Sequence, residues 1–94
     1  MPYYLVRHKV QDYAKWKPIF DQHGAIRQVY GHRGGQLFRN ANVPNELLIL
    51  WEVDDLEKAR QFLQSEDLRQ TMQRAGVADQ PDIYLLELVE HVPV

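Results

Sequence analysis

Four stretches of the sequence have the length of a β-strand and carry apolar residues in alternation or in short runs. Successive side chains of a strand point to opposite faces, so alternation indicates one buried and one exposed face. The predicted strands are residues 3–10, 36–40, Glu46–Val53 and 83–90. Glu46–Val53, with the sequence ELLILWEV, is apolar on both faces through its middle, and so is the last strand. We therefore expect both faces of these two strands to be covered.

An amphipathic stretch that follows the first strand predicts a helix. Asp12 is a suitable N-cap for it, and the pattern continues to about Tyr30, where Gly31 provides the C-terminal stop. Pro18 lies inside this stretch and removes one backbone donor, which predicts a kink or a loose first turn.

A second amphipathic stretch follows Glu46–Val53. Asp54 is the predicted N-cap, with Glu57 at the third helical position in the arrangement of a capping box. Ser65 is suited to cap a further helical piece, which Gly76 ends. The glycines at 34–35 are predicted to form a turn, and residues 41–45 have the composition of a hairpin loop.

The order strand, helix, strand, strand, helix, strand predicts one fold. With right-handed crossovers it gives an α+β ferredoxin-like βαββαβ sandwich, a four-stranded antiparallel sheet with helices on one face. We expect residues 1–94 to form a single domain of this kind. Two helical segments cover only one face, so the sheet is predicted to pack its other face on a second copy of the chain, as a homodimer.

Composition narrows the possible partners. The formal net charge is −2, which disfavours nucleic acid and anionic membranes, since both select basic surfaces. The chain has no cysteine, which excludes disulfides and cysteine-ligated metals. The N-terminus lacks the pattern of a signal peptide and no apolar run is long enough to span a bilayer, so a cytoplasmic protein is expected.

The first predicted helix carries the best candidates for a site. At ~100° per residue its apolar arc includes His23 and Arg27. The apolar members of the arc are Trp16, Ile19, Phe20, Ile26 and Tyr30. Polar groups on a buried face require hydrogen-bond partners or a wet cavity. The pair is therefore either a structural pair, held by carbonyls or a carboxylate, or the lining of a ligand cleft in which His23 is the candidate catalytic base.

The strands place further candidates opposite this helix. Arg7, Lys9, Glu46 and Glu52 mark the face that does not pack on helices, since such packing disfavours charge. The helix-facing set is then Tyr4, Val6, His8, Leu47, Ile49 and Trp51. The predicted ligand-binding residues are His8, Trp16, Phe20, His23, Arg27 and Trp51. Arg7 and Glu52 are predicted to pair diagonally on the other face.

Other chemistries find little support. The four histidines are scattered, without the spacing of a metal site, so no metal is predicted. Ser65 is the only serine and starts a helix, which disfavours a serine nucleophile. An RNA-recognition module shares the strand order, but it requires exposed aromatic residues and a basic surround. Leu48 and Leu50 occupy the corresponding face instead.

Three motifs carry a resemblance to a known group of proteins. They are Asp12-Tyr13-x-x-Trp16-Lys17-x-x-Phe20-Asp21 with Arg27 and Gly31, then Gly35-x-Leu37-Phe38-Arg39-Asn40, and Ser65-Glu66-Asp67-Leu68. On these residues the whole chain resembles the dimeric α/β-barrel superfamily, which includes antibiotic-biosynthesis-monooxygenase-like proteins and many small bacterial proteins.

The resemblance implies a homodimer with a ligand between helices and sheet. The implied activity is that of a cofactor-independent monooxygenase acting on a small aromatic substrate. Members that degrade haem rely on an asparagine, a tryptophan and a histidine. Trp51 and His23 are two of these, but the first strand has no asparagine, so no cofactor is expected. The alternative is a non-catalytic homodimer that binds a small hydrophobic or carboxylate ligand or serves a structural role.

Overall fold

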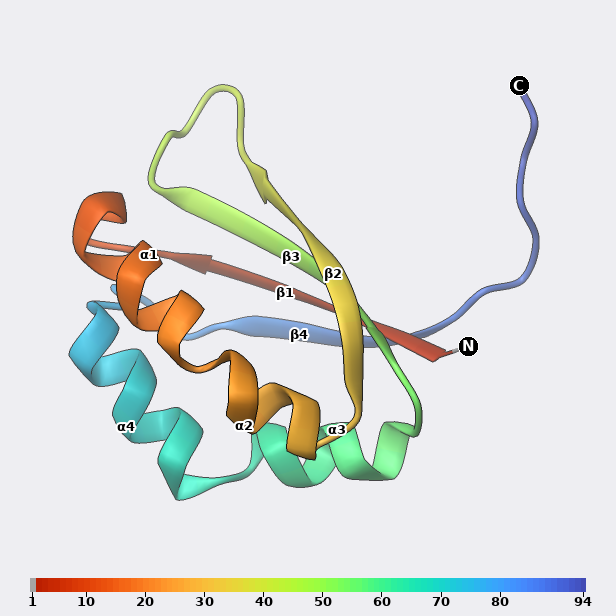
Figure 1. Ribbon diagram of the computed structural model, residues 1–94. Coiled ribbons are helices and arrows are strands. Elements are labelled where there is room, and N and C mark those ends of the chain that lie inside the picture. The colour runs from red at the N-terminus through yellow and green to blue at the C-terminus, as the bar shows by residue number, and fades with distance from the viewer. Residues whose placement is uncertain (1) are drawn as a thin grey trace.

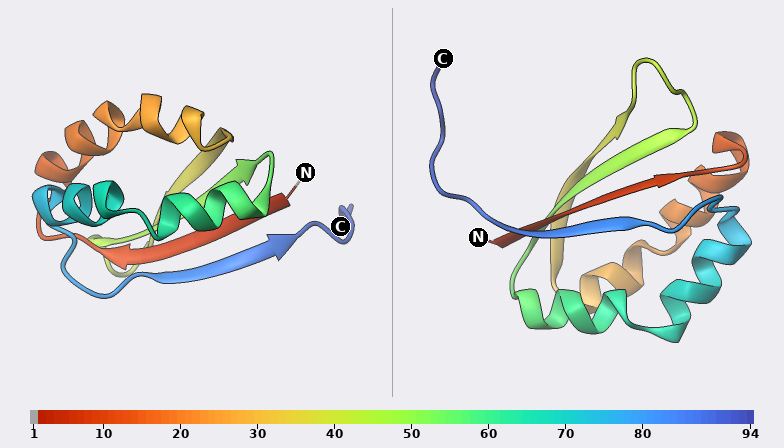
Figure 2. Two further views of the ribbon diagram at one scale, coloured as in Figure 1. Left: turned by 90° about the horizontal axis from the view of Figure 1, so that it is seen from below. Right: turned by 180° about the vertical axis from the view of Figure 1, so that it is seen from behind.

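The computed structural model describes residues 2–94 and has the element order that the sequence predicts (Figure 1). The elements are β1 (Pro2–Lys9), α1 (Tyr13–Gln22), α2 (Gly24–Val29), β2 (His32–Arg39), β3 (Glu46–Val53), α3 (Leu56–Leu63), α4 (Glu66–Ala75) and β4 (Asp82–Glu87). The strands form a four-stranded antiparallel sheet in the order β2-β3-β1-β4. Figure 2 shows the helices together on one side of this sheet. The predicted ferredoxin-like fold is confirmed.

The side chains predicted to face the helices do lie beneath them. Trp51 is partly buried, and at most 4% of the surface is exposed on Tyr4, Val6, His8, Leu47 and Ile49. The strand register explains the arrangement, because β1 positions 4, 6 and 8 pair with β3 positions 51, 49 and 47 and share their face. Burying a large apolar side chain stabilises a fold by roughly 1.5–3 kcal/mol, so this face holds much of the core.

The first helical segment differs from the prediction of one helix kinked at Pro18. α1 continues through Pro18, and the break comes at His23, between α1 and α2. The His23 N–H bonds a carbonyl three residues earlier, at 3.3 Å, as at the end of a helix. Gly24, a weak helix former, comes next. The break changes the helical phase, so Ile26 is 38% exposed instead of buried.

The second strand begins earlier than predicted. Residues 34–35 lie inside β2 and not in a turn, and the register shifts between His32 and Gly34. Gly35 lies opposite Trp51, and a Cβ at this position would lie 2.6 Å from Cε3 of the indole. Glycine is therefore required here because the indole of Trp51 lies against the β2 backbone.

The helix ends follow the predicted capping with one correction. Asp12 and Ser65 accept hydrogen bonds from N–H groups of the first turns of α1 and α4. Gly76 ends α4 in the left-handed conformation, with φ of 76°, which glycine adopts without a steric penalty. The cap of α3 is Asp55 and not Asp54, since Asp55 accepts from an N–H two residues ahead at 2.8 Å.

The last strand is shorter than the predicted 83–90. β4 pairs only with β1, and Glu87 lies opposite Pro2, the first residue of β1. No backbone of β1 remains for pairing beyond this point, so β4 ends there. Residues 88–94 continue as an extended tail that leaves the body of the protein (Figure 1).

The face of the sheet that points away from the helices is uncovered in a single chain. Leu48 and Leu50 are partly exposed there, and Phe38 and Tyr84 are 51% and 56% exposed. A groove of about 640 Å³ crosses one end of this face, between Gln36 and Leu86 on its two outer strands.

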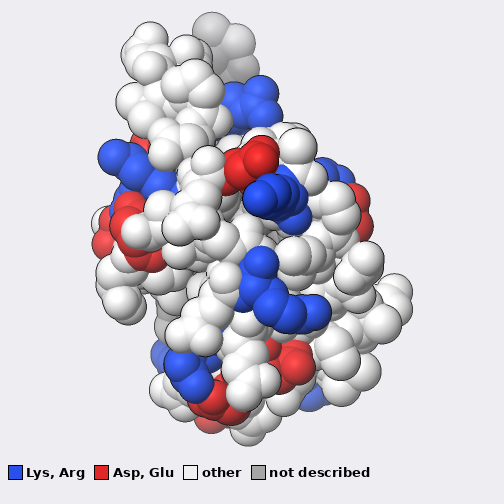
Figure 3. All heavy atoms as spheres, turned by 90° about the vertical axis from the view of Figure 1, so that its left-hand side faces the viewer, with Lys and Arg blue, Asp and Glu red and all other residues white. Residues whose placement is uncertain are grey.

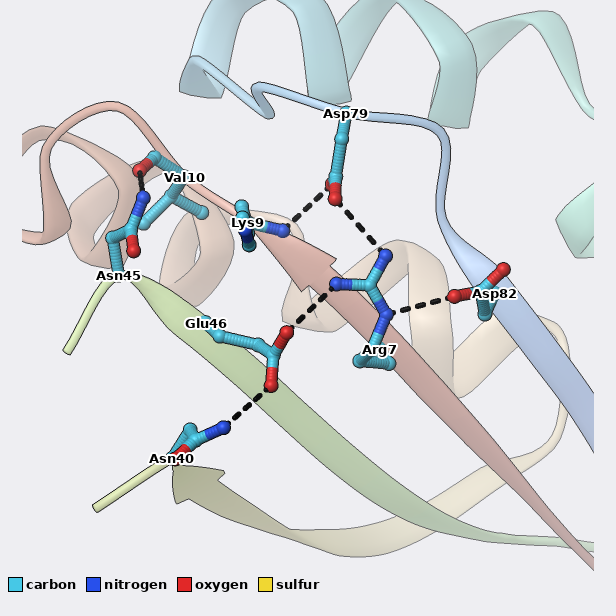
Figure 4. Close-up of polar contacts among 8 residues, drawn as sticks. All are labelled: Arg7, Lys9, Val10, Asn40, Asn45, Glu46, Asp79 and Asp82. Atoms are coloured by element: carbon cyan, nitrogen blue, oxygen red, sulfur yellow. Dashed lines mark hydrogen bonds and ion pairs between the residues drawn. The ribbon is translucent and has the colours of Figure 1, made fainter. Parts of the chain in front are cut away.

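Charged residues gather at the other end of the open face (Figure 4). Arg7 does not pair with Glu52 as predicted, because Glu52 lies opposite Tyr3, four positions away along β1. The Arg7 guanidinium instead donates to Glu46 at 3.0 Å, Asp79 at 2.9 Å and Asp82 at 2.8 Å. The sequence missed this cluster because Asp79 lies in the loop before β4, whose path depends on the tertiary fold.

Candidate functional site

A partly open cavity lies between the helices and the sheet. It has about 510 Å³ of free space including its mouth, of which about 60 Å³ is open to the centre of a water molecule. Since one water needs roughly 10–15 Å³ by the latter measure, the cavity holds more than a single water. Its lining includes every side chain predicted for ligand binding: His8, Trp16, Phe20, His23, Arg27 and Trp51. Their role in binding stays a prediction.

Stacked aromatic rings form one wall of the cavity. Trp16 and Phe20 are one helical turn apart on α1, and their ring centroids lie 4.6 Å apart. Phe20 in turn lies 5.8 Å from Trp51 of β3. Aromatic faces of this kind favour a flat, apolar ligand. The opposite wall, which the sequence did not predict, consists of Phe62 on α3 and of Leu68 and Met72 on α4.

His23 lies at the junction of α1 and α2 and is 8% exposed. Its Nε2 lies 2.6 Å from a carboxylate oxygen of Asp67, in the first turn of α4. Because a carboxylate accepts, Nε2 carries the proton and donates it, which leaves Nδ1 as the basic nitrogen of a neutral ring. This arrangement, a carboxylate that orients an imidazole, is the one that general bases use.

The sequence did not predict the partner of His23. Asp67 lies in the first turn of α4, where the helix dipole favours a carboxylate whether or not it has a side-chain partner. His23 and Asp67 are 44 residues apart in the sequence, so no local pattern predicts that their side chains are hydrogen-bonded.

Arg27 follows His23 by one turn of α2. Its guanidinium carbon lies 4.2 Å from the centroid of the Phe20 ring and 5.0 Å from that of Trp51. No hydrogen bond or ion pair to its side chain is found among residues 2–94. Burial lowers the pKa of Arg27, while the charges of Tyr4 and Asp21 oppose the shift. The group stays a cation, held between aromatic rings and with its N–H donors unused.

His8 contributes a second unpartnered group. It is 3% exposed, and its Nδ1 has no hydrogen-bond partner in the described part of the chain. Burial lowers the pKa of His8, so the ring is neutral at pH 7. Buried polar atoms are nearly always bonded, so Nδ1 in the cavity wall is a hydrogen-bonding group suited to a polar ligand.

A hydrogen-bonded chain behind the cavity fixes the backbone of Arg27. Nδ1 of His32 lies 3.0 Å from the carbonyl oxygen of Arg27, and Nε2 lies 2.6 Å from the Tyr4 hydroxyl. The carbonyl accepts only, so His32 donates to it and accepts from Tyr4. Burial lowers the pKa of His32 to about 4 and raises that of Tyr4. The sequence reasoning missed this chain because the second strand was predicted to begin only at residue 36, whereas His32 is the first residue of β2.

Three further observations concern possible metal, membrane and nucleic-acid binding. No group of three or more His, Asp or Glu side chains within residues 2–94 is arranged to hold a metal ion. None of the helices in that range is both long and apolar enough to cross a bilayer. On the face in Figure 3, positive and negative side chains are interspersed, without the single-sign stripe that nucleic acid selects.

Comparison with known proteins reveals similarity in structure but not in sequence. No protein-family sequence model and no curated protein sequence matches the chain. Among solved structures, a candidate antibiotic biosynthesis monooxygenase from Bordetella bronchiseptica is 17% identical, with a TM-score of 0.78 over 95% of this chain and 97% of that one. SnoaB from Streptomyces nogalater, a cofactor-independent oxygenase, is 15% identical, with a TM-score of 0.76 over 99% and 97%.

A third structure, from Mycobacterium tuberculosis and named Rv0793, is 10% identical, with a TM-score of 0.60 over 97% of this chain and 98% of that one. At these identities the likeness establishes the fold alone. The chain therefore has the fold of antibiotic-biosynthesis-monooxygenase-like proteins over almost its whole length, as the resemblance predicted.

Proposed function

We propose that this protein is a cofactor-independent, monooxygenase-like enzyme that acts on a small aromatic substrate. The observation that carries the proposal is the His23–Asp67 pair, which lies in a cavity with an aromatic wall. An aromatic substrate packs against the aromatic wall of the cavity, and the imidazole reaches an acidic proton at its edge. The similarity in fold to SnoaB supports the same assignment.

The chain's own residues have three tasks in this proposal. His23 removes a proton from a phenol, or from a carbon acid of the substrate, through Nδ1. Asp67 holds the ring and stabilises the imidazolium that forms. Arg27 stabilises the negative charge that develops on the substrate oxygen. A bound substrate displaces water from the cavity, so these electrostatic interactions become stronger than they are in solution.

Dioxygen then reacts with the electron-rich substrate anion. If the carbon attacked is a ring methylene, one oxygen atom becomes the new carbonyl and the other leaves as water. The two hydrogens lost from the carbon are those of this water molecule. The reaction balances with substrate and dioxygen alone, so no flavin, haem or metal is required.

The proposed enzyme is a homodimer that packs the open faces of two sheets together. The support comes from the exposed apolar side chains on that face, Phe38 and Tyr84 among them. A small chain gains stability from such an interface, since a single chain of this size leaves much of its apolar surface in water.

Oxygen uptake tests the proposed activity. We expect metal-free protein to consume dioxygen with at least one member of a panel of naphthols, naphthohydroquinones and anthrones. Asp67→Asn keeps a hydrogen-bonding group at the same place but disturbs the tautomer and charge of the pair, so turnover should fall about 100-fold or more. Glu66→Gln, next to it on α4 but bonded to Arg69, is the matched control and should leave turnover unchanged. No uptake above the uncatalysed rate with any of the compounds contradicts the proposal.

A non-catalytic ligand-binding protein is the alternative function. The unpartnered Arg27 and His8 favour it, since both groups accommodate a ligand without any reaction. Ligand binding that is saturable, together with the absence of oxygen uptake, would favour this alternative.

A further inference from the structure

Arg27 differs from four other arginines of this protein, which form ion pairs. Arg7, Arg33, Arg60 and Arg69 each bind a carboxylate. Arg27 is half-buried in the cavity wall, and no carboxylate or carbonyl among residues 2–94 accepts from it. Its side chain is nevertheless held by the rings of Phe20 and Trp51, and its backbone carbonyl accepts a hydrogen bond from His32. The guanidinium is preorganised and forms no ion pair with any of residues 2–94.

A cation in this position gains much from an anionic ligand. The rings hold the guanidinium away from bulk water, and burial disfavours its charge. An anion that accepts hydrogen bonds from the guanidinium within the cavity replaces the hydration that the buried charge has lost. The carboxylate of Asp21, whose charge raises the pKa of Arg27, does not serve this purpose because it binds Lys17, and that of Asp67 binds His23.

The lining also restricts the kind of anion. Arg27 is the only arginine among the residues that line the cavity, and no lysine lines it within the described part of the chain. One positive charge matches a monoanion and leaves a phosphate dianion uncompensated. The planar fork of a guanidinium matches the two oxygens of a carboxylate, which it binds with two parallel hydrogen bonds.

We propose that the cavity binds aromatic carboxylic acids that carry a hydroxyl next to the carboxylate. Arg27 binds the carboxylate in two hydrogen bonds, the ring packs against the apolar lining of the cavity, and the hydroxyl points to His23, one helical turn away. The five N–H groups of Arg27 suffice for the carboxylate and for the phenolic oxygen beside it. The hydroxyl rests on the proposed function, whereas the carboxylate rests on the geometry of Arg27.

Three naphthalene compounds separate the contributions in a calorimetric binding experiment. They are 3-hydroxy-2-naphthoate, with both groups, 2-naphthol, with the hydroxyl alone, and 2-naphthoate, with the carboxylate alone. We expect wild-type protein to bind 3-hydroxy-2-naphthoate at least 10-fold more tightly than 2-naphthol. In Arg27→Met this preference should vanish, because the affinity for 3-hydroxy-2-naphthoate falls by more than the affinity for 2-naphthol. Arg27→Lys keeps the charge without the fork and should retain only part of the preference.

Arg39→Met is the matched control, because Arg39 also stacks on an aromatic ring, that of Tyr13 at 4.6 Å, but does not line the cavity. It should keep the full preference. Thermal melts of all variants show whether each is folded before its binding is compared.

Equal affinity of the wild type for 3-hydroxy-2-naphthoate and 2-naphthol overturns the inference, and so does a preference that survives in Arg27→Met. Binding of none of the three compounds overturns both this inference and the proposed aromatic ligand. A carboxylate preference that depends on Arg27, without oxygen uptake, supports the inference and contradicts only the proposed catalysis.

Discussion

Truncation of the two stacked aromatic residues of α1 tests whether the cavity is real. Trp16 is 3% exposed and packs against the core, whereas Phe20 is partly buried and faces the cavity. The sequence alone treats them as equal anchors of the helix. The structure predicts that they contribute unequally to the free energy of unfolding.

The magnitudes follow from what each side chain leaves behind. Trp16→Ala removes a buried indole that packs in the core and also borders the cavity, so we expect a loss of roughly 3–5 kcal/mol. Phe20→Ala enlarges a space that already exists and is open to water, so the cost is the lost transfer energy of a partly buried ring, roughly 1–2 kcal/mol. The rings stack with centroids 4.6 Å apart, and such a pair contributes about 0.5–1.5 kcal/mol of coupling.

Urea unfolding followed by circular dichroism measures these differences, since the signal does not depend on the indole that is removed. All variants are compared at one protein concentration because a dimer unfolds in a concentration-dependent way. The double variant gives the coupling energy by difference. A Phe20→Ala variant that loses as much as Trp16→Ala would mean that Phe20 packs in a filled core, and the cavity described above would not exist.

Other expectations concern the dimer, the sheet and the pH dependence. Leu50→Asp places a charge on the open face, and we expect light scattering to detect monomers; an unchanged dimer would refute the proposed interface. Gly35→Ala brings a Cβ to 2.6 Å from the Trp51 ring, so the protein should lose about 1–3 kcal/mol of stability in urea; an unaltered midpoint would refute the close packing. The pKa of His32 is lowered to about 4 in the folded protein, so the unfolded chain binds the proton first. The free energy of unfolding should therefore decline as the pH falls from about 6.5 to about 4. The stability of His32→Gln should decline less over the same pH range; equal slopes of stability against pH for the two proteins would show that His32 does not contribute.

Much of the fold follows from local chemistry. The alternation in Glu46–Val53 and the charges at Arg7 and Glu52 determine which face of the sheet meets the helices, and these are properties of single strands. Asp12, Ser65 and Gly76 act on backbone groups within one turn of the helix. For such features a short stretch of sequence is sufficient.

The errors arise where a distant segment decides the outcome. The glycine at position 35 looked like a turn, but it is required by Trp51 across the sheet. The last strand ends at Glu87 because β1 begins at Pro2, a limit that its own sequence does not contain. Arg7 binds Asp79 from a loop that only the complete fold brings near it.

The candidate site likewise combines residues that the local sequence predicted with residues that only the tertiary fold brings near them. The position of His23 and Arg27 on a buried helical arc indicated a cleft or a structural pair, and both side chains do line the cavity. Asp67 and His32 complete their surroundings from other elements, which sequence periodicity does not bring together.

A crystal structure of the protein soaked with 2-naphthol is the most direct test of the proposed substrate site. We expect density for a flat ring against Phe20 and Trp51, with the naphthol oxygen within hydrogen-bonding distance of His23. A ligand bound only in the groove of the open face, or a cavity filled by a rearranged Phe20 or Arg27 side chain, would contradict the assignment of this cavity as the substrate site.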